Sequence, residues 1–213
     1  MPERPPFLFR DVEGETLLLV EGIEDARFFS AILRRLKRDD VQIARVGGRN
    51  SFRPFLNSVL SKSENFSRLR RLGIVRDADL SAESTLRSLR DALDAANLPA
   101  PSQAWEVAVG DRLRVSLAIL PDGSSQGNLE DLCLRAIGNS PEGMCVEQYV
   151  GCRVGAGSHI ADHKISKTKV HAYLSVGNDG ADPGLRLGEA AEAGVWDWEA
   201  PAFRQMVEFL HNL

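Results

Sequence analysis

Acidic side chains follow two apolar runs of this sequence, each at the point where the run ends. The runs occupy residues 17–20 and 72–75 and are typical of buried strands in a parallel sheet. The acids that follow them are Glu21, Asp25, Asp77 and Asp79. The carboxyl ends of parallel strands meet at one edge of the sheet, which is where open α/β sheets keep their sites. Converging carboxylates repel one another unless a divalent cation joins them, so the pattern predicts a site for one or two Mg²⁺ or Mn²⁺ ions.

The spacing of these acids allows a role for each. Asp77 and Asp79, two positions apart, can reach one ion if the chain turns between them. Glu21 can bind the same ion or accept a proton as a general base. Asp25, one helical turn after Glu21, lies on the same side of the predicted first helix and can bind a second ion. Gly22 lets the backbone approach a phosphate at the N-terminus of that helix. Taken singly, each acid also fits a plain helix cap.

Two further segments carry groups that suit a phosphate. The turn Val46-Gly47-Gly48-Arg49 can contact phosphate through backbone N–H groups, although it lacks the Gly-Lys-Ser/Thr of a P-loop. Lys164, Lys167 and Lys169 form a basic segment, and any one of them would stabilise a pentavalent phosphorane if it reached the site. A solvated basic helix face explains the same lysines without chemistry.

The acidic pattern resembles the Toprim domain of topoisomerases, DnaG-type primases, RecR-type repair proteins and OLD-family nucleases. The Toprim signature is a glutamate and a glycine after the first strand and an Asp-x-Asp after a later strand. Glu21-Gly22 and Asp77-Ala78-Asp79 match it, and Asp25 matches an acid that OLD-like members carry four residues after the glutamate. The resemblance covers residues 14–135. It implies a Toprim-like Rossmannoid core with a nuclease site.

The resemblance to OLD-like nucleases also implies a further metal-binding acid after the core strands. Glu130, in the stretch 127–132, is the first candidate because this stretch looks most like the family's pattern. Asp122, at the end of the preceding strand, is its rival. A helix start capped by Asn128 explains Glu130 without any metal.

OLD-like nucleases use a lysine after the core, which makes Lys167 and Lys169 the candidates for a catalytic lysine here. Residues 167–173 and 194–198 also resemble a small bacterial family with OLD-type Toprim cores. OLD-like systems pair their Toprim domains with ATPase modules, and this sequence contains no ATPase motif. The resemblance therefore raises an ATPase as a partner protein.

The whole pattern predicts an α/β fold with a mostly parallel central sheet flanked by helices. Residues 1–138 are expected to form the Toprim-like catalytic core, and residues 139–213 a mainly helical C-terminal extension packed on it. We expect strands at 16–20, 41–46, up to Asp77, 104–109 and 113–120, the last two as a hairpin around Gly110-Asp111. We expect helices at 24–38, 51–61, 82–96, from 128, 141–150, 159–175, 186–193 and 201–212.

The composition is that of a soluble domain, since 43% of the residues are apolar and can form a substantial core. No apolar run approaches the roughly 20 residues that cross a bilayer, and the first residues lack the apolar core of a signal peptide. We therefore expect a cytoplasmic protein with no membrane association. The three cysteines, Cys133, Cys145 and Cys152, contain no C-x-x-C pair. They are expected to be buried free thiols rather than disulfides or zinc ligands.

These features predict a Mg²⁺- or Mn²⁺-dependent nuclease that uses metal-activated water, with DNA or RNA left open as the substrate. The net charge of −4 does not by itself indicate nucleic-acid binding. Bound cations would, however, offset the charge of the acids, and the basic residues are concentrated in local clusters. A tyrosine nucleophile is not favoured. Toprim topoisomerases supply it from a separate domain, whereas Tyr149 and Tyr173 both lie in the last third of this chain, without a recognisable module of that kind. Two alternatives remain: a module that binds nucleic acid or a nucleotide without cleavage, and an effector subunit that needs an ATPase partner. A homodimer is also left open.

Overall fold

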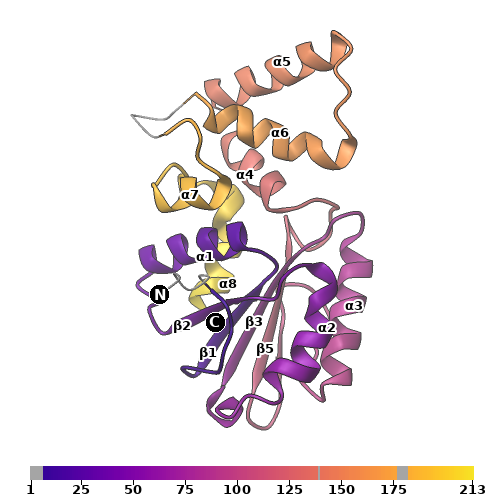
Figure 1. The fold of residues 1–213 in the computed structure, drawn as a ribbon, viewed down its shortest axis with the longest axis vertical. Helices are drawn as coiled ribbons and strands as arrows, with labels where there is room; N and C mark the ends of the chain where they lie inside the picture. The colour runs from indigo at the N-terminus through magenta and orange to yellow at the C-terminus, as the bar shows by residue number, and fades with distance from the viewer. Residues whose placement is uncertain (1–6, 139, 177–181) are drawn as a thin grey trace, which may run out of the picture.

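The computed structural model describes residues 7–138, 140–176 and 182–213. They form an α/β fold around a five-stranded sheet with the strand order β2-β1-β3-β5-β4 (Figure 1). All neighbouring strands are parallel except β4, which pairs antiparallel with β5 at one edge. The predicted mostly parallel sheet and the hairpin around Gly110 are therefore confirmed. The strands are β1 (Thr16–Val20), β2 (Val41–Arg45), β3 (Arg71–Asp77), β4 (Val107–Val109) and β5 (Arg114–Leu120).

The inner strands are aliphatic on both sides because helices cover both faces of the sheet. Leu18 and Val20 of β1 point into one core, and Leu17 and Leu19 point into the other. The first core is covered by α1 (Ile23–Arg35), α7 (Leu187–Glu192) and α8 (Arg204–His211). The second is covered by α2 (Phe52–Pro54), the π-helical turns at Phe55–Leu60 and α3 (Ala82–Ala95). The remaining helices are α4 (Leu129–Ile137), α5 (Pro141–Gly155) and α6 (Asp162–Leu174), with 3₁₀ turns at Arg49–Ser51, Phe66–Arg68 and Pro201–Phe203.

Several elements differ from the sequence prediction. α5 runs to Gly155 rather than to residue 150, and β4 begins at Val107 rather than at residue 104. Two other helices differ as well. The first helix ends at Arg35 rather than at residue 38, because the chain turns at Lys37, whose φ of 56° is left-handed. The helix expected at 51–61 is a composite of a 3₁₀ turn, α2 and π-helical turns. In its last turn the N–H of Ser61 donates to the carbonyl oxygen of Leu56 at 3.2 Å, a π-type bond.

The direction of the strand order changes at β1. The chain adds β2 on one side of β1 and then places β3 on its other side. The segments that leave the carboxyl ends of β1 and β3 therefore diverge, and this switch point is where open α/β sheets bind their ligands. Glu21 follows β1 directly and Asp77 is the last residue of β3, so the topology places both acids at the switch point.

The helical C-terminal part returns to the α1 side of the sheet, while α4, α5 and α6 extend beyond it (Figure 1). α7 packs against α1 so closely that a Cβ at Gly188 would lie 2.6 Å from the carbonyl oxygen of Glu24. Trp198 then packs edge-on against Phe28 of α1, with ring centroids 5.1 Å apart. The predicted boundary between residues 138 and 139 stays a prediction, and residue 139 lies outside the described residues.

Among the described helices, none combines the length and apolar character that crossing a membrane requires. All three cysteines are free thiols, as predicted. Cys133 is buried, but the prediction of burial is wrong for Cys145 and Cys152. Both lie on α5, which buries only Gly143, Val146 and Val150 and leaves its other side exposed.

Candidate functional site

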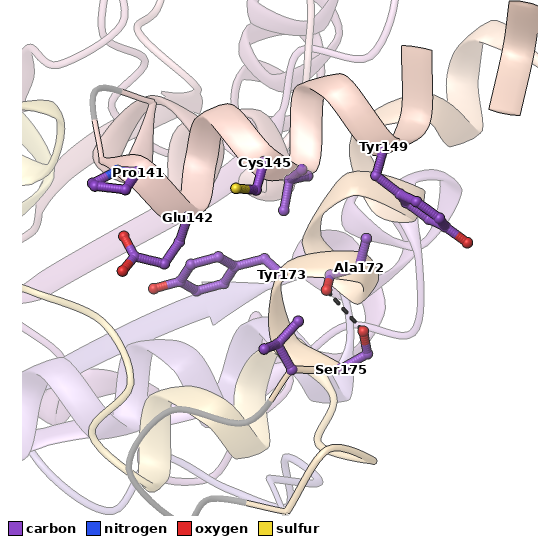
Figure 2. Close-up of a pocket in the computed structure, with 9 residues that line it drawn as sticks. Pro141, Glu142, Cys145, Tyr149, Ala172, Tyr173 and Ser175 are labelled. Atoms are coloured by element: carbon purple, nitrogen blue, oxygen red, sulfur yellow. Dashed lines mark hydrogen bonds between the residues drawn. The ribbon is translucent and has the colours of Figure 1, made fainter. Parts of the chain in front are cut away.

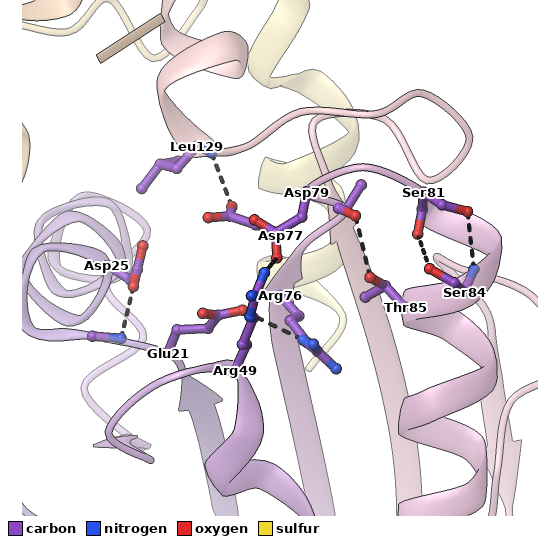
Figure 3. Close-up of polar contacts among 12 residues, drawn as sticks. Glu21, Asp25, Arg49, Arg76, Asp77, Asp79, Ser81, Ser84, Thr85 and Leu129 are labelled. Atoms are coloured by element: carbon purple, nitrogen blue, oxygen red, sulfur yellow. Dashed lines mark hydrogen bonds and ion pairs between the residues drawn. The ribbon is translucent and has the colours of Figure 1, made fainter. Parts of the chain in front are cut away.

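The candidate site lies at the carboxyl ends of β1 and β3, where four acids predicted from the sequence gather (Figure 3). Asp77 is the central one. Burial raises its pKa well above the ordinary value, and the negative charges of Asp25, Glu21, Glu130 and Asp79 raise it further. The structure thus brings five of the predicted acids close enough to repel one another.

Asp77 also fixes the start of α4. Its Oδ1 accepts a hydrogen bond from the N–H of Leu129, the first residue of that helix, at 2.9 Å. The helix begins with a capping box, in which Asn128 accepts from the N–H of Asp131 and Asp131 accepts from the N–H of Asn128. These bonds place Glu130 in the first turn of α4, beside the acids of the sheet.

Glu21 is partly buried and faces Arg76 of β3. The distance from Arg76 Nε to Glu21 Oε1 is 3.4 Å, which makes an ion pair, but the two atoms are not aligned for a hydrogen bond. Burial raises the pKa of Glu21, and the positive charge of Arg76 only partly offsets this effect. A carboxylate with a raised pKa is better suited to accept a proton near neutral pH than an ordinary one.

Asp25 lies in the first turn of α1 and caps the start of its own helix. Its Oδ2 accepts from the N–H of Gly22 at 2.7 Å, which ties the acid to the residue that follows Glu21. Burial raises the pKa of Asp25, although the bond from Gly22 works in the opposite direction. Asp25 and Glu130 both line a hollow of about 320 Å³, together with Lys167 of α6. The charge of Lys167 lowers the pKa of Glu130, but burial outweighs it and the net shift is upward.

Asp79 is held by its backbone. Its φ of 51° is left-handed, and its N–H and carbonyl exchange two 2.9 Å hydrogen bonds with Gly127. Gly127 has a φ of 135°, which a residue with a side chain rarely adopts. The Asp79 carboxylate is consequently free to turn toward Arg49, whose Nη1 lies 3.1 Å from its Oδ2.

The structure does not bring all the predicted residues to this place. Asp122 lies against Arg135 at 2.6 Å and accepts bonds from Ser124 and Ser125, in a different hollow from Glu130. Lys169 donates to Glu147 of α5 at 2.7 Å, whereas Lys167 is the lysine beside Glu130.

The glycine turn at residues 47 and 48 has a structural task. The N–H groups of Gly47 and Gly48 both donate to the carbonyl oxygen of Glu21 at 3.0 Å. Both N–H groups are therefore bonded within the chain, and the phosphate contact expected from the sequence stays a prediction. The same bonds hold the backbone of Glu21 in place between β1 and α1.

Arg76 is a residue of the site that the sequence analysis missed. It is only 8% exposed and its guanidinium lies over the ring of Phe52, with 5.7 Å from Cζ to the ring centroid. The available signal was its position between the apolar run 72–75 and Asp77. A strand that is covered on both faces leaves little solvent for a charged side chain, so an arginine there calls for a partner.

The donor set consists of carboxylate oxygens, the ligands that Mg²⁺ and Mn²⁺ prefer. Glu21 Oε1 is buried and has no hydrogen bond within the described residues, so it can accept an ion. Among those residues, however, no three His, Cys, Asp or Glu side chains already converge as a complete set of metal ligands.

A separate apolar pocket lies between α5 and α6, away from the acids. Tyr173 and Tyr149 project from the two helices beside Cys145, and Glu142 stands at one end (Figure 2). Its lining includes no residue of the acidic group.

Residues 15–213 match the model of a protein family that is described as "Protein of unknown function (DUF3226)". The chain belongs to the DUF3226 family. No curated protein matches this DUF3226 member. Solved structures similar to it include the C-terminal region of the Burkholderia pseudomallei OLD protein, with 15% identity, a TM-score of 0.47, and coverage of 94% of this chain and 98% of that one. The C-terminal region of the Xanthomonas campestris pv. campestris OLD protein is similar at 14% identity and a TM-score of 0.47, covering 94% and 95% of the two chains. Likenesses this distant carry no argument about activity.

Proposed function

We propose that this protein hydrolyses phosphodiester bonds of nucleic acid with one or two Mg²⁺ or Mn²⁺ ions, on a Toprim-like core. The observation that carries the proposal is the group of five acids at the switch point: Glu21, Asp25, Asp77, Asp79 and Glu130. Like charges that raise one another's pKa cost folding energy. A chain that places them together gains from a cation that binds there.

The acids divide naturally into two groups. Asp77 and Asp79 would hold one ion together with Glu21, and Asp25 and Glu130 would hold a second. When bound, such ions would neutralise the charge that develops on a phosphodiester during hydrolysis.

The side chains of the site then have separate tasks. Glu21 accepts the proton of the attacking water as the new P–O bond forms, and the leaving oxygen takes up a proton from solvent as its bond to phosphorus breaks. The Lys167 ammonium offsets the negative charge that builds on the phosphoryl oxygens. We propose Lys167 rather than Lys169 because Lys167 shares a hollow with Glu130, whereas Lys169 is paired with Glu147.

Cleavage assays with Asp77→Ala/Asp79→Ala test the proposal directly. Single- and double-stranded DNA and RNA are incubated with the purified protein in Mg²⁺, Mn²⁺ or EDTA. Wild type should cleave at least one substrate only with metal. The double variant should be slower by about 100-fold or more, the upper end of what even the outer partners of a metal site contribute. Asp39→Ala/Asp94→Ala removes the same charge from exposed positions and should cleave like wild type.

Cleavage that persists in Asp77→Ala/Asp79→Ala would falsify the proposal. Metal and oligonucleotide binding without any turnover would instead favour the binding module. Turnover that appears only after an ATPase partner is added would favour the effector subunit.

A further inference from the structure

A second charged hollow lies on the α2 and α3 side of the sheet, next to the acids. It has a volume of about 380 Å³, within the range of roughly 300–1,000 Å³ that small-ligand sites occupy. We call it the arginine hollow. Its charged lining is Arg49, Arg53, Arg76, Arg87 and Asp91. Four cations against one carboxylate make it a place for an anion.

Arg76 is the buried arginine of the arginine hollow. It is more than nine-tenths buried, and its Nε makes no hydrogen bond with any described residue. The ring of Phe52 lies against its guanidinium and holds it in place. A buried Nε without a hydrogen bond is costly, and its nearest anion is the Glu21 carboxylate. The only ion pair of Arg76 within the described residues is the one with Glu21 at 3.4 Å.

The arginine hollow and the acids share two contacts. Arg76 pairs with Glu21, and Arg49 pairs with Asp79 at 3.1 Å (Figure 3). Both carboxylates are metal ligands in the proposed function. When they bind a cation, the two arginines lose much of the charge that now balances them. They are then available to an anion that lies beside the metal site.

The two outer arginines are also available. Arg53 is exposed and makes no ion pair within the described residues. Arg87 pairs with Glu83 at 2.7 Å, one helical turn away, but both side chains are at least 70% exposed. An ion pair of this kind is weak and gives way readily to a stronger anionic ligand.

We propose that the arginine hollow binds a backbone phosphate of the nucleic-acid strand, adjacent to the phosphate at the acids. This rests on the proposed function, because the acids define which phosphate is cleaved. The planar guanidinium suits phosphate because its N–H groups bond two oxygens at once. The hollow therefore fixes the position of the strand and carries no base preference, since every nucleotide offers the same phosphate.

Binding of a short fluorescein-labelled oligonucleotide, measured by anisotropy in Ca²⁺ at several KCl concentrations, tests this proposal. Arg53→Gln/Arg87→Gln should weaken binding about 10-fold at low salt and reduce the slope of log K against log salt by about 1. The same loss is expected for different oligonucleotide sequences. Arg68→Gln/Arg90→Gln removes two equally exposed arginines outside the hollow, one of them on α3 beside Arg87, and should leave the slope unchanged.

Equal loss of affinity and slope in both double variants would overturn the proposal, because it would mean a diffuse effect of net charge. The failure of the nuclease proposal looks different. If wild type never cleaves but only Arg53→Gln/Arg87→Gln loses affinity and slope, the phosphate subsite stands and the nuclease proposal falls. If wild type cleaves with metal and all variants bind alike, the nuclease proposal stands and the arginine hollow falls.

Discussion

At the scale of single residues, two aspartates of this chain behave in opposite ways. The pKa of Asp77 is raised by burial and by neighbouring acids. Burial also acts on Asp122, but hydrogen bonds from Ser125, Arg135 and Ser124 outweigh it and hold the pKa of Asp122 well below its ordinary value. Asp122 is therefore satisfied by its own loop, whereas Asp77 stays in a repulsive environment that a cation would relieve.

The repulsion around Asp77 leads to a prediction for Asp77→Asn. Asparagine keeps an oxygen that can accept the bond from Leu129 but removes the charge. We expect the substitution to stabilise the metal-free protein at neutral pH, because it removes a charge that burial and the neighbouring acids disfavour.

The pH dependence gives the sign of the effect. Because the folded-state pKa of Asp77 lies above the unfolded value, the folded wild type holds more protons in the interval between the two, and its stability falls as pH rises through that interval. The advantage of Asp77→Asn should therefore vanish below about pH 4, where the carboxyl is protonated in both states. Urea unfolding in EDTA measures this, with Asp94→Asn as the exposed control. A loss of stability at neutral pH would contradict the prediction.

At the scale of elements, the site depends on how helices begin. α1 starts at Gly22, whose N–H is bonded by Asp25, and α4 starts at Asn128, whose N–H is bonded by Asp131. The cap at Asn128 was predicted from sequence and is confirmed. Each capped start sets the direction of the acids in its first turn.

The contact between α1 and α7 leads to a prediction for Gly188→Ala. A Cβ there would lie 2.6 Å from the Glu24 carbonyl oxygen and 2.7 Å from the Arg27 Cβ, so the two helices must separate. We expect a loss of about 1–3 kcal/mol in the free energy of unfolding, the usual cost of overpacking. Chemical denaturation measures it.

Gly151→Ala on α5 is the matched control for this prediction. A Cβ at Gly151 meets nothing within 4 Å, so the better helix propensity of alanine should stabilise the protein by up to about 1 kcal/mol. Similar effects of both substitutions would show that α7 does not pack tightly on α1.

At the scale of the whole molecule, the strand order gathers residues from distant parts of the chain. Glu21, Asp77 and Glu130 are separated by some 50 residues at each step, yet the switch point and the start of α4 bring them together. The acids concentrate negative charge in a chain whose net charge is only −4. Divalent binding should therefore stabilise the fold as a whole.

Thermal unfolding with and without Mg²⁺ tests this at the molecular scale. At about 100 times the dissociation constant, binding to the folded state contributes about 2.7 kcal/mol. For a chain of this size we expect the melting temperature to rise by about 5–10 °C. Asp77→Ala/Asp79→Ala should lose the response, and NaCl at matched ionic strength should not reproduce it. An equal rise in wild type and variant would argue against a site at these acids.

The strands, most helix starts and the position of the acids at the two strand ends could be predicted from the sequence alone. Alternation, apolar runs and caps are local properties that each segment carries by itself. Only the tertiary structure separated Asp122 from Glu130 and Lys169 from Lys167, and only it revealed the buried Arg76. Such choices depend on which way a side chain points once helices have packed on the sheet, and that direction is set by contacts between residues far apart in the chain.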